Sequence, residues 1–535
     1  MFSRLSTRRV LYRRPFVDKR RSPNALVTSP YTTTSASPRT SGSILKQAAT
    51  AVTVLVGGSL FAVYYFDSRS AIHRYFFTPL IRNVLDPEVA HKVAVKVLKS
   101  GLAPRDMGVD DERLSTELWE EKLSNPIGLA AGFDKNGEAI DGLFNLGFSW
   151  VEIGSVTPRP QPGNPKPRVF HLPEDSAIIN RYGFPSDGAL SVLSRLRARL
   201  SSVFSLTSSV SGPTLFPIPV LQQPELKAES KINNASLRPR SLLAINLGKN
   251  KTSPTDSSAD FIDGIRIFGQ YADVLVVNIS SPNTPGLRSM QSSSVLKNLL
   301  SAIVKERDSL LSEGQVLTGG RKPRLVLKVA PDLTEGELKD VASAIKSVSG
   351  VDGIIVSNTT IQRPSTLSPN SHTTETGGLS GPPLKPLTLR AIRTLRSSLP
   401  SSVPLIACGG VSSGSDALEY ARAGANLVQM YTHFSWDGVG AVRRVKDELT
   451  KELEKEGKTW NEIVKNSVDA LSEKTVPTAV TKDQLSSKGE ARSSKPDLAM
   501  KVLIDEALAI REKLDALSEK MSVNEENENP GSVTP

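Results

Sequence analysis

The chain has 535 residues, of which 38% are hydrophobic and 23% are charged, and this is the composition of a globular protein. It excludes a fully disordered chain and a collagen-like repeat, and a single cysteine, Cys408, excludes a disulfide framework. The formal net charge of +11 raises the hypothesis of nucleic-acid binding, which depends on where the charge lies.

Most of the positive charge lies in residues 1–66, which hold ten Lys or Arg residues and one acidic residue, Asp18. The rest of the chain has 56 basic and 54 acidic residues, so it is nearly neutral and we expect no nucleic-acid partner. Residues 1–46 are rich in Arg, Ser and Thr, which is typical of a mitochondrial transit peptide. A basic nucleic-acid-binding arm is the alternative.

Residues 47–66 (QAATAVTVLVGGSLFAVYYF) contain no charged side chain and are just long enough to cross a lipid bilayer. Tyr64 and Tyr65 at the end of this segment are typical of the membrane interface. A buried core helix and a secretory signal peptide are the alternatives, although the apolar part of a signal peptide is shorter. We therefore predict a single transmembrane helix behind a cleavable leader.

Residues 67–105 show two short apolar stripes at helical spacing, separated by the helix-start signal Asp86-Pro87. The second stripe lies opposite Lys92, Lys96 and Lys99. Two amphipathic helices next to a membrane span predict a lid on the bilayer surface. Two ordinary helices packed on the main domain are the alternative.

Residues 106–465 alternate short apolar runs with helical stretches, as expected for an α/β fold. Runs that are apolar throughout are typical of strands buried on both faces of a parallel sheet. There are eight such runs: Ile127–Ala131, Trp150–Gly154, Leu242–Asn246, Val274–Ile279, Leu325–Val329, Gly353–Ser357, Pro404–Cys408 and Leu427–Met430. Eight βα units, with no GxGxxG after the first strand, predict a closed (β/α)8 TIM barrel rather than an open doubly wound sheet.

Two segments do not fit the barrel pattern. Residues 201–240 are rich in Ser and Pro, and we predict a flexible insertion there. Residues 466–535 predict a tail with one amphipathic helix, Asp497–Ser518, which either pairs with a partner helix or is solvated.

The ends of the predicted strands carry the residues for chemistry, because barrel active sites lie at that end. Small residues after the first strand let a flat ring approach the backbone, and Lys135 adds a cation there. Asparagines follow several strands: Asn180, Asn246, Asn278, Asn283 and Asn358. Each alone is more typical of a helix cap or turn, but together they favour a planar polar ligand such as a pyrimidine.

The last two predicted loops favour a phosphate site, since Gly409 and Gly410 follow the seventh strand and Tyr431 and Thr432 follow the eighth. Tight-turn glycines are the alternative. The sequence shows no motif for a metal. Proton transfer would then fall to Ser281 or a lysine, and serine needs help to act as a base.

These stretches resemble the dihydroorotate dehydrogenases of the membrane-bound, quinone-reducing class. The resemblance covers residues 70–465 apart from the insertion. It includes the segments GLAAGFDKNGE (128–138), INRYGF (179–184), VVNISSPNTPGLR (276–288), ETGGLSGPPL (375–384) and VQMYT (428–432). It implies one FMN per chain, oxidation of (S)-dihydroorotate to orotate in UMP biosynthesis, and ubiquinone as the electron acceptor.

The resemblance also implies the site residues. Ser281 matches the catalytic base, and Thr284 and Phe184 match residues that relay its proton. The implied substrate contacts are Lys135, Asn180, Arg181, Tyr182, Gly183, Phe184, Asn278, Asn283, Asn358 and Thr359. The implied FMN contacts are Ala130, Ala131, Gly132, Ser155, Asn180, Asn246, Asn278, Lys328, Ser357, Gly381, Gly410, Tyr431 and Thr432.

The two helices of residues 67–105 match those through which ubiquinone reaches the flavin, with His91, His171 and Tyr431 at the quinone site. His171 is a departure, because many animal members have arginine there. The resemblance further implies a monomer, anchored by one helix in the inner mitochondrial membrane with its catalytic domain facing the intermembrane space. A flavin barrel acting on another pyrimidine or on tRNA uridine, and an inactive membrane-tethered barrel, are the alternatives.

Overall fold

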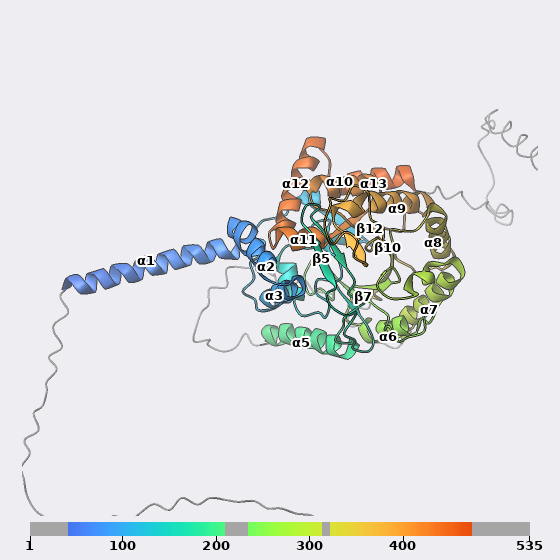
Figure 1. Cartoon of the computed structure of the whole chain (residues 1–535), viewed down its shortest axis with the longest axis horizontal. Coiled ribbons are helices and arrows are strands. Elements are labelled where there is room, and N and C mark those ends of the chain that lie inside the picture. Colours follow the sequence, from blue (N-terminus) through green and yellow to red (C-terminus); the bar gives the residue numbers. More distant parts are fainter. Residues whose placement is uncertain (1–40, 209–233, 313–320, 473–535) are drawn as a thin grey trace, which may run out of the picture. The chain divides into compact units, whose positions relative to one another are not determined.

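The computed structural model describes residues 41–208, 234–312 and 321–472, and eight parallel strands close a barrel at its centre (Figure 1). All eight strands were predicted, and the barrel confirms the predicted fold class. The strands are β3 (Ile127–Leu129), β4 (Trp150–Val156), β7 (Leu242–Leu247), β8 (Val274–Asn278), β9 (Arg324–Val329), β10 (Gly353–Val356), β12 (Leu405–Cys408) and β13 (Leu427–Met430). The barrel closes where Val428 of β13 lies beside Ile127 of β3.

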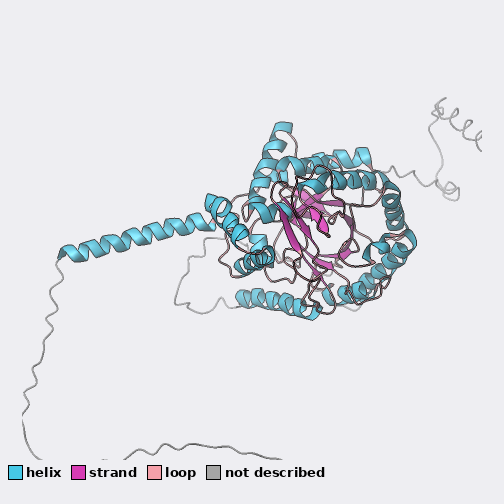
Figure 2. Cartoon of the chain, viewed as in Figure 1, coloured by secondary structure: helices cyan, strands magenta, loops and turns pink. Residues whose placement is uncertain are grey.

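Helices surround the strands, as Figure 2 shows in cyan around magenta. They are α4 (Ile140–Asn145), α5 (Ala189–Ser208), α6 (Ala259–Phe268), α7 (Ser293–Ser312), α8 (Glu335–Ser347), α9 (Lys385–Ser398), α10 (Gly414–Arg422), α11 (Thr432–Asp437), α12 (Ala441–Glu456) and α13 (Trp460–Leu471). Residues at the N-terminus can favour helix formation, and α8 is an example. Thr334 and Glu337 form a capping box there, which satisfies backbone N–H groups that the first turn of a helix leaves unpaired.

Alternate residues of each strand face opposite sides of the barrel wall, so the core has two parts. The inner part contains Trp150, Val276 and Ile406, and the outer part packs under the helices. A short hairpin, β1 (Thr116–Leu118) and β2 (Glu121–Leu123), adds Leu118 and Leu123 to the inner cluster. The inner core is therefore solid at the end where the hairpin packs, and any site has to lie at the other end.

Helix α1 (Ser41–Phe66) contains the segment Leu45–Phe66, which is long and apolar enough to cross a membrane, and its most apolar stretch is not buried against other described residues. It starts before residue 47, so residues 41–46, which were predicted to belong to the leader, are helical. The rest of that leader lies outside the described residues.

Two helical units follow α1 in the chain. A π-helical turn (His73–Phe77) continues into α2 (Thr78–Val84), and α3 (Pro87–Lys99) comes next. Asp86 caps α3, because its Oδ1 accepts the N–H groups of Glu88 at 2.9 Å and Val89 at 3.2 Å. The two helices predicted for residues 67–105 are thus present.

A second sheet of three antiparallel strands was not predicted. It joins β5 (Val169–Leu172), β6 (Ala177–Asn180) and β11 (Gly378–Ser380) in the order β11-β6-β5. Asn180 pairs with Gly378, about two hundred residues away in sequence. These strands are three or four residues long and follow loops, so they give no period-2 signal that is long enough to detect.

The structure corrects two predicted boundaries. The predicted insertion 201–240 is too long at both ends: α5 continues to Ser208, and the N–H groups of Ala235 and Ser236 donate to Asp273 at 2.6 and 3.0 Å. Residues 209–233 lie outside the described structure. The barrel domain ends later than the predicted residue 465, because α13 runs to Leu471. The predicted tail helix Asp497–Ser518 also lies outside the described residues.

Candidate active site

A cavity of about 530 Å³ lies at the carboxyl ends of the barrel strands. Its lining extends from Tyr65 at the end of α1, past Phe77 and Ile81 on the α2 side and Ala94 on α3, to Ser281 on the loop after β8. A volume of this size is typical of a site for a cofactor or small ligand. The cavity therefore connects the apolar N-terminal helices with the polar end of the barrel.

The cavity brings together nearly all the side chains and glycines predicted for the site. The lining includes Ala130, Ala131, Gly132, Lys135, Ser155, Asn180, Tyr182, Gly183, Phe184, Asn278, Ser281, Asn283, Lys328, Ser357, Asn358, Thr359, Gly381, Gly410, Tyr431, Thr432, His91 and His171. Three predicted residues are outside it: Arg181, Asn246 and Thr284. The Arg181 guanidinium instead pairs with Glu375 at 2.6 Å, so it does not reach into the cavity.

The asparagines form two hydrogen-bonded groups. The Nδ2 of Asn278 donates to Ser155 Oγ at 3.0 Å and to Asn246 Oδ1 at 3.2 Å, and the Nδ2 of Asn358 donates to Asn278 Oδ1 at 3.4 Å. The Nδ2 of Asn283 donates to the backbone carbonyl of Asn180 at 3.2 Å. Asn246 thus lies behind the lining and orients Asn278, while the other amides face the cavity.

A buried charge cluster lies in the barrel under the cavity, and its carboxylate was not predicted from the sequence. Glu152 of β4 is fully buried and accepts hydrogen bonds from Asn246 Nδ2 and Gln429 Nε2, both at 2.6 Å. The ammonium of Lys328 lies 3.4 Å from the same carboxylate. The signal was present in the sequence, since Glu152 interrupts the otherwise apolar run Trp150–Gly154.

The charge state of this cluster follows from its surroundings. Burial by itself lowers the pKa of Lys328, but the carboxylate of Glu152 overcomes this and raises it. Burial raises the pKa of the neighbouring Cys408 thiol to about 11, so the thiol is neutral near pH 7. Lys328 therefore stays charged because of Glu152, and it presents a cation to the floor of the cavity.

Lys135 follows β3 and is half-buried, with its remaining surface toward the cavity. Its Nζ donates to the carbonyl of Gly132 at 2.5 Å and lies 4.3 Å from the centre of the Tyr182 ring. Desolvation lowers the pKa of Lys135 to about 7, and Glu88 opposes this effect. An anionic ligand in the cavity would stabilise the charged form.

Ser281 is buried on the loop after β8, and its Oγ accepts the N–H of Asn283 at 3.3 Å. Phe184 lines the same cavity with a positive φ of 55°, a backbone conformation that bulky residues rarely adopt. Thr284 is buried three residues after Ser281 but is not part of the lining. A hydroxyl, an aromatic ring and a second hydroxyl thus lie on the loops where the sequence analysis expected proton transfer.

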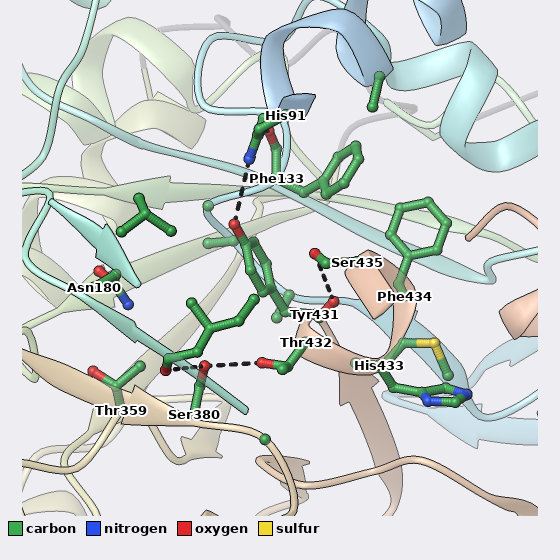
Figure 3. Close-up of a pocket in the computed structure, with 18 of the residues that line it drawn as sticks. His91, Phe133, Asn180, Thr359, Ser380, Tyr431, Thr432, His433, Phe434 and Ser435 are labelled. Carbon is green, nitrogen blue, oxygen red and sulfur yellow. Dashed lines mark hydrogen bonds between the residues drawn. The ribbon is translucent and has the colours of Figure 1, made fainter. Parts of the chain in front are cut away.

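His91 of α3 lines the cavity next to Tyr431, and a hydrogen bond joins the two side chains (Figure 3). Burial and the charge of Lys135 lower the pKa of His91 to about 3, so its ring is neutral. Its Nε2 therefore donates to the carbonyl of Phe133 at 2.6 Å, and Nδ1 is left as the acceptor. The hydroxyl of Tyr431 lies 3.4 Å from that Nδ1 and can donate to it.

His171 of β5 lies in the apolar part of the cavity beside Trp436, with ring centres 5.1 Å apart. The guanidinium of Arg82 lies 4.5 Å from the centre of the Trp436 ring and lines the same cavity. Burial, followed by the charge of Arg82, lowers the pKa of His171, so the cation on this wall comes from Arg82. The sequence pattern did not indicate a role for Arg82, because it lies on an amphipathic helix, where a charged residue is ordinary.

The lining of the cavity fits the flavin that the sequence resemblance implies. The Oε1 of Gln429 is buried without a hydrogen-bond partner, and it lines the cavity together with the ammonium of Lys328. An unpaired acceptor beside a donor fits the pyrimidine edge of a flavin, which presents an N–H between two carbonyls. At Gly410, which has a φ of 70°, an added Cβ would lie 2.7 Å from the Cβ of Lys385, so only glycine fits at this position of the loop. These residues fit the group, and the described residues contain no cluster that could hold a metal ion.

A closed barrel with a polar cavity at the carboxyl ends of its strands defines an enzyme of the (β/α)8-barrel class. Residues 113–453 match the family model described as dihydroorotate dehydrogenase. The dihydroorotate dehydrogenase (quinone), mitochondrial, of Kluyveromyces lactis is 48% identical over 413 residues, which is 76% of this chain and 88% of that protein. The protein of the same name from Mus musculus is 45% identical over 414 residues, covering 77% and 95%.

A solved structure of the Eimeria tenella enzyme in complex with ferulenol is also similar, with a TM-score of 0.61 and 36% identity. It covers 74% of this chain and 98% of that one. The chain belongs to the dihydroorotate dehydrogenase family. It is an oxidoreductase that oxidises dihydroorotate in pyrimidine biosynthesis with a quinone as the acceptor, as the sequence resemblance implied.

Proposed function

We propose that the chain uses one FMN to carry electrons from (S)-dihydroorotate to ubiquinone, at the inner mitochondrial membrane. The observation that supports this most strongly is the single cavity that joins Ser281 and Lys135 at the barrel to Phe77 and Ala94 in the N-terminal helices. A polar substrate and an apolar acceptor can thus each approach a cofactor that lies between them. When bound, FMN would supply a hydride acceptor for C6 of the substrate and an electron donor for the quinone.

The substrate contacts are proposed from the cavity lining. Lys135 would bind the carboxylate of dihydroorotate, because its side chain lines the cavity together with the asparagines and, unlike Lys328, is not paired with Glu152. The amides of Asn180, Asn278, Asn283 and Asn358 offer donors and acceptors to the ring. Tyr182, Gly183, Phe184 and Thr359 would complete the pocket. Arg181 is proposed to support it from outside, since its side chain is paired with Glu375.

Ser281 is proposed to remove the C5 proton of the substrate. The N–H of Asn283 donates to its Oγ, and this contact stabilises the negative charge on that oxygen as the hydroxyl loses its own proton and takes up the C5 proton. The aromatic ring of Phe184 and the hydroxyl of Thr284 are proposed to control the route of that proton to solvent. Thr284 would act from behind the lining, where it is buried.

The proposed cofactor site uses three kinds of group. The flavin ring would approach the backbone at four small residues, Ala130, Ala131, Gly132 and Gly381. Polar groups would be supplied or oriented by Lys328, Ser155, Asn180, Asn246, Asn278 and Ser357. The phosphate would be held by Gly410, Tyr431 and Thr432. Lys385 near the phosphate loops already pairs with Asp416 at 2.5 Å and Glu419 at 2.6 Å. Backbone N–H groups are therefore the proposed phosphate donors.

The quinone is proposed to enter between α2 and α3. His91 and Tyr431 would meet its head group, because their hydrogen-bonded pair lies where the apolar part of the cavity ends. His171 would contribute a neutral imidazole to the wall.

The proposed location rests on the N-terminal features. The basic leader supports import into mitochondria, and the relatives compared above are named mitochondrial. The unburied apolar helix α1 supports a single-pass anchor in the inner membrane. We propose that the catalytic domain faces the intermembrane space and that the enzyme is a monomer.

The test is an anaerobic titration of the purified full-length protein with dihydroorotate. Bleaching of a flavin spectrum, followed by reoxidation with a short-chain ubiquinone and by neither fumarate nor NAD, is the expected result. A protein that takes up no FMN, or whose flavin is not bleached, would contradict the proposal and favour an inactive barrel. Bleaching by another reduced pyrimidine instead would favour a different flavin barrel.

A further inference from the structure

A buried ion pair joins α3 to the loop before β5, and the mechanism above does not use it. The Nε and Nη2 of Arg168 donate to the carboxylate of Glu88 at 3.0 and 2.8 Å. The side chains are only 8% and 9% exposed. Glu88 lies in the first turn of α3, one turn before His91. A bidentate pair with this geometry fixes the position of both side chains.

The pair reaches the proposed substrate site along two paths. The guanidinium of Arg168 lies 5.3 Å from the centre of the Tyr182 ring, and the ammonium of Lys135 lies 4.3 Å from the centre of the same ring. Arg168 also donates to the carbonyl of Asn164 at 2.9 Å, and Asn164 Nδ2 donates to the carbonyl of Asn283 at 3.3 Å. One buried pair on the N-terminal helix thus braces two residues proposed to bind the substrate.

We propose that Glu88 is a positioning residue for dihydroorotate: through Arg168 and Tyr182 it holds Lys135 charged and in place, and so couples the quinone-side helix α3 to the substrate pocket. The proposal rests on the proposed function, because it takes Lys135 as the residue that binds the substrate carboxylate. It extends that function by giving a helix of the quinone entrance a part in substrate affinity.

The charges around Lys135 explain the direction of the effect. Glu88 and Lys92 face it from α3, Arg168 and Tyr182 face it from the loops beside the second sheet, and Asp134 precedes it. Desolvation, Arg168 and Lys92 lower the pKa of Lys135, whereas Glu88 and, to a smaller extent, Asp134 raise it. Without the charge of Glu88, the unpaired Arg168 would repel Lys135, and Lys135 would lose its proton at a lower pH.

The coupling works in both directions. A displacement of α3 that separates Glu88 from Arg168 weakens substrate binding, so substrate binding must in turn favour the docked position of α3. Occupancy of the substrate site therefore stabilises the wall along which the quinone enters.

The experiment measures orotate affinity of the full-length FMN-loaded enzyme in detergent, from the change in the flavin spectrum, between pH 6 and 9. Glu88→Gln is expected to move the alkaline loss of affinity about one pH unit lower, as removal of one nearby charge does. Starting from a Lys135 pKa of about 7, this corresponds to roughly a ninefold weaker Kd at pH 8 and about a twofold weaker Kd at pH 6. Glu88→Asp should restore the wild-type profile.

The matched control is Lys166→Gln, because Lys166 also approaches Glu88, at 3.5 Å, but is exposed. It should leave the profile unchanged. If Glu88→Gln weakens binding equally at every pH, or not at all, the proposal is wrong. If that variant does not fold, the double variant Glu88→Gln/Arg168→Gln removes both charges of the ion pair. It is expected to keep the wild-type pH midpoint of orotate binding but to bind orotate more weakly at every pH. A wild-type orotate affinity in the double variant would overturn the proposal.

A Lys135→Met variant separates this proposal from the proposed function. Loss of orotate binding in this variant, together with an unchanged profile in Glu88→Gln, overturns the role of Glu88 alone. Wild-type orotate binding in Lys135→Met overturns the substrate contact itself, and the role of Glu88 with it.

Discussion

The substitution Glu152→Gln keeps the shape of a side chain in the barrel interior but removes its charge. Glu152 is fully buried, accepts two hydrogen bonds of 2.6 Å, and lies 3.4 Å from the ammonium of Lys328. An amide at this position has one acceptor oxygen, so it cannot accept from both Asn246 and Gln429 in the same way. The variant therefore breaks the ion pair with Lys328, and it turns the N–H groups of the new amide toward the donor nitrogen of either Asn246 or Gln429.

The size of the effect follows from these contacts. Removing one partner of a buried pair costs about 3–5 kcal/mol, because the remaining charge stays buried without compensation. Lys328 can escape part of this cost by losing its proton, since burial by itself lowers its pKa. We therefore expect Glu152→Gln to lose about 3 kcal/mol of unfolding free energy, which is roughly a hundredfold in the folded-to-unfolded ratio.

The assay is urea unfolding of the full-length protein in detergent at saturating FMN, followed by tryptophan fluorescence. Lys328→Met in the Glu152→Gln background removes the orphaned charge and should recover at least 1 kcal/mol, as double-mutant cycles of buried pairs do. The control is Glu337→Gln at the exposed cap of α8, for which the expected loss is about 1 kcal/mol or less. A Glu152→Gln protein within 1 kcal/mol of wild type would refute the reasoning.

Three further predictions concern the site and the N-terminal region. Ser281→Ala should retain FMN and slow flavin reduction by dihydroorotate by about 10²–10⁴-fold, and unchanged single-turnover reduction by stopped flow would exclude Ser281 as the base. Deletion of residues 1–66 should give a detergent-free protein that reduces a short-chain quinone; loss of FMN from it would mean that α1 supports the barrel. The pKa of Glu88 lies at about 2, below its ordinary value of 4.5, because of its hydrogen bonds with Arg168. Its stabilising effect is therefore complete above about pH 4.5 and lost as the pH falls toward 2, so the stability difference between wild type and Glu88→Gln should shrink over this range.

The barrel could be predicted because its signals are local. Each strand is an apolar run, such as Val274–Asn278, followed by a turn residue and a helical stretch, and eight such units leave few alternatives to closure. The three-stranded sheet could not be predicted in this way. Its pairing of Asn180 with Gly378 joins segments far apart in sequence, and neither strand is long enough to show a periodic pattern.

The site shows the same division. The polar strand-end residues, such as Asn278 and Asn358, could be collected from the sequence because the fold places the ends of parallel strands together. Which of them face the cavity depends on side-chain pairing: Arg181 turns away because Glu375 binds it, and Asn246 lies behind Asn278. Glu152 was missed because partners from three other strands make its burial tolerable, and a single sequence does not show them.

The antiparallel pairing of β6 with β11 has a consequence for how the protein folds. The register places Asn180 opposite Gly378, and a slip by one residue would turn the asparagine to the other face of its strand. Contacts between segments so distant in sequence close large loops, which is entropically costly until the intervening chain is compact. We therefore expect the barrel to form first and this wall of the cavity to assemble on it, so that newly made enzyme reaches full compactness before it can recognise its substrate.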